Sequence, residues 1–121
     1  MAEQLTVLGT GFAVATKCYT TCFTISDGEE HFMIDTGGGS GVLTNLETLN
    51  ISYNQVHHIF LSHCHTDHVM GVVWMLRMIG QSMQKGVYEA PWSSSAAPHI
   101  HQSRYNLGTR RHHGSHNGAK I

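Results

Sequence analysis

The sequence predicts a single α/β domain, and three observations lead to this prediction. Short apolar runs of strand length recur from residue 4 onward, two segments repeat apolar residues at helical spacing, and glycines or polar turns separate these segments. Their order is also informative, because strands come first and then alternate with helices. With 121 residues, the chain can form one modest domain with a single core. We therefore expect a sheet that helices cover on at least one face.

Four segments have the composition of strands. Residues 4–9 alternate polar and apolar side chains and end in glycine. Residues 20–26 form a second strand pattern, which the turn sequence DGEE connects to a short apolar run at residues 31–35, as in a hairpin. Residues 57–62 are a further apolar strand. The glycine-rich sequence TGGGSG at residues 36–41 predicts a tight connection from the third strand to a helix.

Two segments have the periodicity of amphipathic helices. The first covers residues 41–49, with Ser40 at the position of an N-terminal cap. Its apolar positions are Val42, Leu46 and Leu49. The second covers residues 68–80, and Gly80 stands where a helix would naturally end. Its apolar positions are Val69, Val72, Val73, Leu76 and Ile79.

The charges divide the chain into two unlike parts. Residues 1–89 carry all eight acidic residues but only three basic ones, a net charge of −5, whereas residues 90–121 carry four basic residues and no acidic one. The second part also has only three residues from the set Leu, Ile, Val and Phe, and it has no strand or helical period. It cannot bury enough apolar area to offset the entropy of ordering, so we predict an atypical, basic, disordered tail. A shifted reading frame would produce such an abrupt change in composition.

The sequence has the features of a cytoplasmic protein. Its N-terminus lacks the basic and long apolar regions of a signal peptide, and no stretch approaches the roughly 20 apolar residues that span a bilayer. The three cysteines, Cys18, Cys22 and Cys64, are odd in number and do not indicate a disulfide framework. We therefore expect reduced thiols, a cytoplasmic location and no membrane partner.

A dense cluster of metal-binding residue types follows the fourth strand. His63 and His65 stand two positions apart, so in an extended segment their side chains point the same way. Asp67 and His68 follow at the turn into the next helix and can face a second point nearby. Neutral imidazole and carboxylate are the ligands that zinc and similar divalent metals prefer. The pattern therefore predicts a site for two metal ions that share a bridging hydroxide as the nucleophile.

The same residues resemble the signature of the metallo-β-lactamase superfamily of binuclear metallohydrolases. The resemblance extends from the strand that ends in LGTG, through FMIDTGGGSG at residues 32–41, to the histidine motif, and it covers about residues 4–86. Within the superfamily, the pattern is similar to the first half of ribonuclease Z and its close relatives. The resemblance implies that residues 1–89 form the N-terminal half of a metallo-β-lactamase αββα sandwich, in which two sheets face each other and helices lie outside.

The resemblance also implies roles for individual residues. His63 and His65 would bind the first metal ion, and Asp67 and His68 would bind the second. Asp67 would also act as a general acid or base, and Asp35 would orient the metal-binding loop from behind the ligands. The cofactors would be two divalent ions, zinc first, with manganese or iron as alternatives. The reaction would be hydrolysis of a phosphodiester in an RNA substrate, as in an endonuclease.

The chain also departs from the family pattern. Full-length relatives are considerably longer, and their second half supplies a third histidine for the first metal ion, a bridging aspartate and a final histidine. The sequence offers no position for these residues. We therefore expect the chain alone to hydrolyse a phosphodiester slowly, unless histidines of the tail or a second copy in a homodimer complete the site. A truncated, catalytically incompetent metal-binding fragment is the alternative interpretation.

The sequence Asp35-Thr36-Gly37 suggests a different class of enzyme. Retroviral-type aspartic proteases have an apolar run before Asp-Thr-Gly, and they join two such aspartates in a homodimer. A helical pattern surrounds Ile79, however, where that fold needs a strand, and the histidine cluster would remain unexplained. An aspartic protease that uses Asp35 is therefore only a minor alternative.

Overall fold

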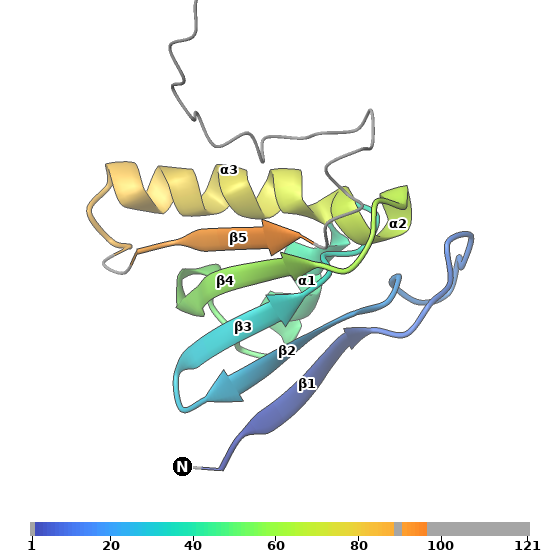
Figure 1. Ribbon diagram of the computed structural model, residues 1–121, viewed down its shortest axis with the longest axis horizontal. Helices are drawn as coiled ribbons and strands as arrows, with labels where there is room; N and C mark the ends of the chain where they lie inside the picture. Colours follow the sequence, from blue (N-terminus) through green and yellow to red (C-terminus); the bar gives the residue numbers. More distant parts are fainter. Residues whose placement is uncertain (1, 89–90, 97–121) are drawn as a thin grey trace, which may run out of the picture.

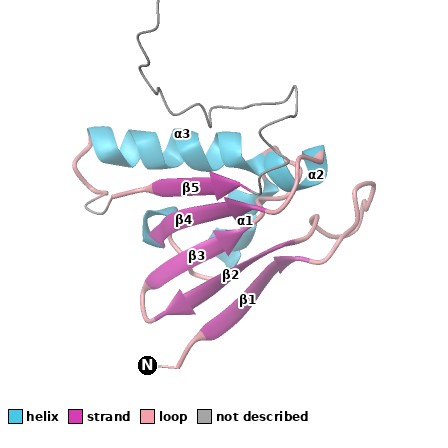
Figure 2. Cartoon of the chain, in the orientation of Figure 1, coloured by secondary structure: helices cyan, strands magenta, loops and turns pink. Residues whose placement is uncertain are grey.

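The computed structural model describes residues 2–88 and 91–96, which form one five-stranded sheet with helices packed on one face. The strands are β1 (Gln4–Gly9), β2 (Cys22–Asp27), β3 (Glu30–Ile34), β4 (Val56–Leu61) and β5 (Ser93–Ala96). The helices are α1 (Gly41–Thr48), α2 (Thr66–Val69) and α3 (Gly71–Gln84), and the 3₁₀ turn η1 covers Tyr53–Gln55. Figure 1 shows α1 behind the sheet, and Figure 2 shows how strands and helices are distributed.

The strands lie across the sheet in the order of the sequence, which confirms the four predicted strands and their hairpin. β1, β2 and β3 are antiparallel neighbours, and Gly28 in the turn of the β2–β3 hairpin has a φ of 73°. β4 is parallel to β3, and β5 is parallel to β4. The carboxyl ends of β3 and β4 therefore meet at one edge of the sheet. The N–H of Asp35 donates to the carbonyl of Phe60 over 2.8 Å, so the pairing continues just past β3.

The core lies between the sheet and the two longer helices. Alternate side chains of the strands point into it, which gives the buried set Leu8, Cys22, Met33, Val56, Ile59 and Leu61. The helices α1 and α3 contribute Val42, Leu46, Val72, Met75 and Ile79. Burial of each large apolar side chain of this kind contributes about 1.5–3 kcal/mol relative to its exposure. The core therefore holds both helices against the same face of the sheet.

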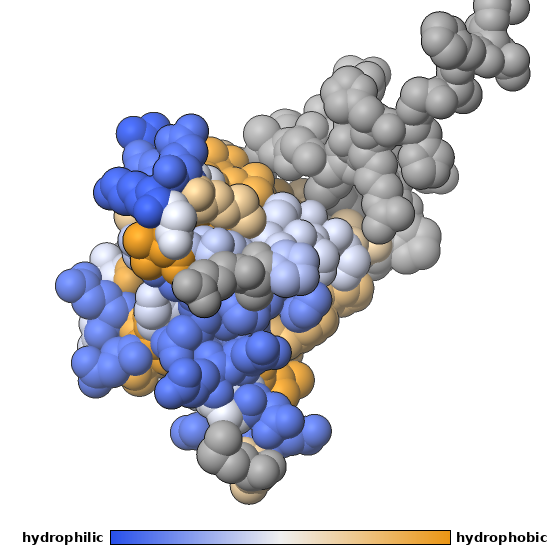
Figure 3. Space-filling model, turned by 90° about the vertical axis from the view of Figure 1, so that its left-hand side faces the viewer, coloured by the Kyte–Doolittle hydropathy of each residue, from blue (hydrophilic) through white to orange (hydrophobic). Residues whose placement is uncertain are grey.

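The opposite face of the sheet is partly open and apolar. Its side chains include Leu5, Val7, Ile25 and Phe32, which are 40–61% exposed. Leu5 pairs with Ile25, and Ile25 pairs with Phe32, so these side chains form a continuous row across three strands. Figure 3 shows hydrophilic residues over much of the end of the molecule that it faces, with hydrophobic residues along its right-hand border.

Both helix predictions need corrections at their ends. Ser40 directly precedes α1, but its backbone is helical and its side chain makes no capping hydrogen bond, because a cap needs an extended backbone at this position. Leu49 lies after α1 and is 43% exposed, so it is not a core residue. α3 passes through Gly80 and ends at Gln84. The glycine that follows the helix is Gly86, whose φ of 70° suits a C-terminal stop.

The second helical segment is also divided. Val69 belongs to the short helix α2, and Met70 separates α2 from α3. Val69, Val72 and Ile79 are buried as predicted, whereas Val73 is 40% exposed. The break turns the chain between the histidine motif and the longer helix. No helix among residues 2–88 and 91–96 is long and apolar enough to cross a membrane.

The prediction of a wholly disordered tail from residue 90 is wrong for residues 93–96, which form β5. This strand has the sequence SSSA and no apolar period, so its residues gave no strand signal. It forms because β4 presents backbone N–H and C=O groups along its free edge, and pairing with them does not depend on side chains. The predictions for residues 89–90 and 97–121 lie outside the residues that the structure describes.

Candidate metal centre

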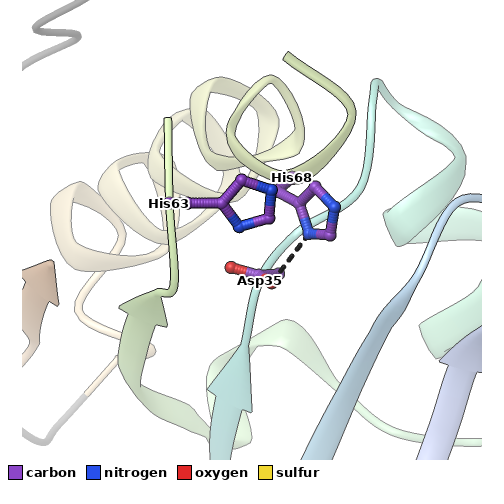
Figure 4. Close-up of side chains that lie close together, drawn as sticks. All are labelled: Asp35, His63 and His68. Atoms are coloured by element: carbon purple, nitrogen blue, oxygen red, sulfur yellow. Dashed lines mark hydrogen bonds and ion pairs between the residues drawn. The ribbon is translucent and has the colours of Figure 1, made fainter. Parts of the chain in front are cut away.

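The predicted site residues gather at the edge of the sheet where β3 and β4 end. Asp35 directly follows β3, His63 lies two residues after β4, and His68 belongs to α2. Figure 4 shows the side chains of these three residues converging from their different elements. One potential ligand atom from each lies within 4.8 Å of the others, so the three residues can hold a metal ion.

Asp35 accepts three hydrogen bonds at the base of this cluster. The Ser62 N–H donates to Oδ1 over 2.8 Å, and the Ser62 hydroxyl donates to Oδ2 over 2.6 Å. Nδ1 of His68 lies 2.8 Å from the same Oδ2 (Figure 4). The aspartate side chain is only 8% exposed, and its backbone has a φ of 55°, a left-handed conformation that is rare for a residue other than glycine. The fold thus holds Asp35 in one place.

The rings of the motif histidines lie close to one another. The ring centroids of His63 and His65 are 4.7 Å apart, and those of His63 and His68 are 4.0 Å apart. His65 is exposed and precedes the first residue of α2. The structure therefore brings His63 and His65 together as the spacing predicted. His68 lies near His63 as well, rather than at a clearly separate point.

Asp67 completes the cluster from the first turn of α2. Its Oδ2 lies 3.2 Å from Nε2 of His68, and the two side chains are 15% and 17% exposed. When Nδ1 of a neutral His68 donates to Asp35, its Nε2 presents a lone pair toward the Asp67 carboxylate. Two acceptors at this distance need a positive partner, which a proton or a divalent cation can supply. This pairing fits the metal-binding role that the sequence predicts for both residues.

The electrostatics of His63 also suit a metal ligand. Burial lowers the pKa of His63, and the neighbouring His68 lowers it further, while Asp35 and Asp67 act in the opposite direction. The net effect favours the neutral imidazole, which is the form that binds metal. Imidazoles with nearby carboxylates form a donor set that suits zinc and other first-row divalent metals.

Asp35 can be considered either as a ligand or as a support for the ligands. Its position among the potential donors would allow direct binding. Both carboxylate oxygens, however, already accept hydrogen bonds from Ser62 and His68. Direct coordination would compete with these bonds, so we favour the supporting role, in which Asp35 orients His68. The same engagement argues against an aspartic protease, because Asp35 is buried among hydrogen-bond donors of its own chain.

Two residues of the site were missed by sequence reasoning. Ser62 bonds to Asp35, and its Oγ lies 2.8 Å from Nδ1 of His63. Tyr19 holds the glycine-rich loop, because its hydroxyl lies 2.8 Å from the carbonyl oxygen of Thr36 and 2.7 Å from that of Gly39. Ser62 could have been noticed because it adjoins the motif. Tyr19 gave no signal, since its contacts span 17 and 20 residues.

The loop is also tied directly to the helix that carries His68. The N–H and hydroxyl of Thr36 both donate to the carbonyl of His68, over 2.8 and 2.9 Å. The N–H of Gly38 donates to the hydroxyl of Thr20 over 2.8 Å. The glycine loop is therefore the tight connection that the sequence predicted. It fixes α2 relative to the end of β3.

Among the residues that the structure describes, three further histidines lie outside the cluster. Nδ1 of His31 is 3.2 Å from the Thr24 hydroxyl, and Nε2 of His57 is 3.1 Å from the carbonyl of Asn54. His58 is exposed and contacts the hydroxyl of Ser93 on β5. The three side chains thus occupy surface or internally satisfied positions.

The chain is similar to several known proteins. Residues 3–87 match the model of a protein family described as anti-Pycsar protein Apyc1. The chain is 30% identical over 92 residues to ribonuclease Z of Azobacteroides pseudotrichonymphae, a match that covers 73% of this chain and 31% of the relative. It is 32% identical over 78 residues to ribonuclease Z of Bacteroides thetaiotaomicron, over 64% of this chain and 24% of the relative. The chain thus spans less than a third of the length of these relatives.

Solved structures show the same fold. The metallo-β-lactamase fold protein YhfI of Bacillus subtilis superposes with a TM-score of 0.63 at 19% identity, over 78% of this chain and 46% of that protein. The short form of human tRNase Z superposes with a TM-score of 0.57 at 19% identity, over 78% and 44%. The predicted metallo-β-lactamase fold is therefore confirmed for this part of the chain.

Proposed function

We propose, from the premise that the chain belongs to the family of anti-Pycsar protein Apyc1 and has the metallo-β-lactamase fold, that it carries the first set of metal ligands of a metal-dependent hydrolase. The observation that carries this proposal is the convergence of Asp35, His63 and His68, with His65 and Asp67 beside them. The proposed substrate is a phosphodiester in RNA. It is supported by the similarity to proteins named ribonuclease Z.

The proposed roles are those expected from the sequence motif. His63 and His65 would hold one divalent ion, and Asp67 and His68 would hold a second, with zinc as the first candidate. Bound ions would supply Lewis-acid chemistry, which stabilises charge on a phosphoryl oxygen and activates water at neutral pH. Asp67 would also transfer a proton through its carboxylate, and Asp35 would keep the His68 ring oriented.

The proposal also includes a cellular location and an oligomeric state for the protein. Cys18, Cys22 and Cys64 are free thiols, which suits a reducing compartment such as the cytoplasm. A homodimer is one way to bring further ligands to the site and to cover the apolar row on the open face of the sheet. Light scattering on the purified chain, with and without zinc, would measure its mass and decide this point.

An assay of the purified chain tests the function. Bis(4-nitrophenyl) phosphate and a short RNA are incubated with the chain after chelation, and again after addition of zinc or manganese. We expect slow cleavage that requires the metal and is lost in Asp67→Asn. Asp27→Asn serves as the control, because Asp27 is exposed at the end of β2. Cleavage that survives chelation or the Asp67 substitution would contradict the proposal.

The alternative is a metal-binding fragment without catalytic activity of its own. Two observations favour it, because each proposed metal ion has only two ligands among the described residues and the chain spans less than a third of its curated relatives. A catalytic zinc ion usually has three protein ligands and a water. Stoichiometric metal binding with no metal-dependent cleavage would support this alternative.

A further inference from the structure

We propose that Ser62 is a positioning residue that, together with Asp35, fixes the proton of His63 on Nδ1 and so leaves Nε2 free for a metal ion. The inference deepens the proposed function and rests on it, because it concerns the same cluster. It starts from three contacts: Ser62 Oγ with Asp35 Oδ2, Ser62 Oγ with His63 Nδ1, and Asp35 Oδ2 with His68 Nδ1.

The direction of the first bond is fixed by chemistry. An ionised carboxylate only accepts hydrogen bonds, whereas a serine hydroxyl has one proton to donate and lone pairs to accept with. Ser62 Oγ lies 2.6 Å from Asp35 Oδ2, a length typical of a hydroxyl that donates to a carboxylate. Ser62 therefore donates its only hydroxyl proton to the Asp35 carboxylate.

The second bond follows from the first. Because Ser62 donates its proton to the carboxylate, its Oγ can only accept a hydrogen bond from His63, whose Nδ1 lies 2.8 Å away. His63 must then carry a proton on Nδ1, and a neutral ring with this proton has its lone pair on Nε2. The serine thus links the buried carboxylate to the His63 ring through two hydrogen bonds.

The same carboxylate acts directly on His68. Nδ1 of His68 lies 2.8 Å from Asp35 Oδ2, so His68 also carries its proton on Nδ1 and presents Nε2 toward the Asp67 carboxylate. One aspartate therefore selects equivalent ring forms of two histidines, one directly and one through Ser62. This explains why a polar side chain stands between β4 and the motif, where the strand could simply have ended in another apolar residue.

The backbone gives this arrangement its rigidity. The N–H of Ser62 donates to Asp35 Oδ1, so both the main chain and the side chain of the serine are held by the same carboxylate. Ser62 cannot move away from Asp35 without breaking two bonds. A purely structural role for the serine would explain these two bonds, but it would not require the proton of His63 to be on Nδ1.

Nitrogen-15 NMR of the metal-free protein separates these two roles. At a pH where imidazoles are neutral, long-range correlations between ring nitrogens and ring protons show which nitrogen carries the proton. We expect His63 and His68 to have it on Nδ1 in the unmodified chain. In Ser62→Ala, His63 should move toward the Nε2-protonated form that free imidazoles prefer, while His68 keeps its proton on Nδ1. Ser62→Thr, which retains the hydroxyl, should restore His63.

The control is Ser40→Ala, because Ser40 is exposed and its side chain makes no capping bond. It should leave both rings unchanged. If Ser62→Ala does not fold, the unmodified chain still decides the question, since a proton on Nε2 of His63 would overturn the proposal. An unchanged His63 in a folded Ser62→Ala variant would overturn it as well.

Metal binding provides a second measurement. We expect Ser62→Ala to weaken zinc affinity in competition with a chelator by about 10- to 100-fold, the usual range for loss of a group that orients a ligand. Ser62→Thr should recover most of this loss, and an affinity unchanged in Ser62→Ala would contradict the role. Because the NMR measurement needs neither metal nor substrate, it can succeed even if the proposed hydrolase activity is absent.

Discussion

Gly71 lies so close to Thr36 that a Cβ atom added to the glycine would stand 2.1 Å from the threonine carbonyl oxygen. The N–H of Gly71 donates a hydrogen bond to the carbonyl of Gly37 over 2.9 Å. The start of α3 is thus pressed against the loop that follows β3. We predict that Gly71→Ala will lower the free energy of unfolding by at least about 1–3 kcal/mol, because the loop or the helix must shift. Urea unfolding followed by circular dichroism would measure the change.

Gly80 provides the matched control, since it lies in the middle of the same helix and an added Cβ would meet nothing within 4 Å. Gly80→Ala should stabilise the protein by roughly 0.5–1 kcal/mol, because alanine favours a helix more than glycine does. If both substitutions had the same effect, close packing at Gly71 would not be the cause.

We predict that Tyr19→Phe will destabilise the protein by about 1–3 kcal/mol. The carbonyls of Thr36 and Gly39 share the one proton of this hydroxyl, which also accepts from the N–H of Gly39 over 3.2 Å, so its loss leaves loop groups without their partner. Tyr88→Phe is a suitable comparison, because the Tyr88 hydroxyl makes one bond, to the carbonyl of Val56. Chemical unfolding should show a smaller loss for Tyr88→Phe, and a larger one would refute the loop argument.

The metal site predicts a selective loss of zinc. His63→Ala/His65→Ala should remove most bound metal, because it deletes both proposed ligands of one ion. His57→Ala/His58→Ala removes two adjacent histidines of β4 that lie outside the cluster, and this variant should retain its metal. Elemental analysis after dialysis would measure both. Equal metal contents in the two variants would rule out the proposed ligands.

Stability should depend on pH through His31. Burial lowers the pKa of His31 below its ordinary value of 6.5, so the unfolded chain binds a proton more readily than the folded one. The free energy of unfolding of the metal-free protein should therefore decrease as the pH falls below about 6.5. Unfolding curves at several pH values should show a weaker dependence in His31→Gln than in His58→Gln. Identical slopes would show that His31 does not contribute.

Much of the fold could be predicted because local patterns control it. The strand composition of β2 and β3 was visible in the sequence, as was the helical spacing of Val72 and Ile79. The errors arose where tertiary contacts decide the outcome. β5 depends on the edge of β4, and α3 continues past Gly80 because nothing at that position requires the helix to end.

The residue types of the candidate site could also be predicted, because the spacing of His63, His65, Asp67 and His68 is itself the signal. The supporting contacts could not. Asp35 and His68 are separated by 33 residues, and the contact between them depends on the parallel pairing of β3 and β4. A sequence pattern does not show which strands pair with each other until the topology is known.

The order of the strands across the sheet has a consequence for the nascent chain on the ribosome. Each strand from β2 to β5 pairs with the strand made just before it, so every newly synthesised strand finds its partner already present. Synthesis proceeds at about 5–20 residues per second, which is slow compared with the microseconds needed to form a hairpin. The sheet can therefore grow by addition at one edge as translation proceeds. Asp35 is made before the histidine motif, and it reaches its place when β4 pairs with β3 and brings Phe60 and Ser62 beside it.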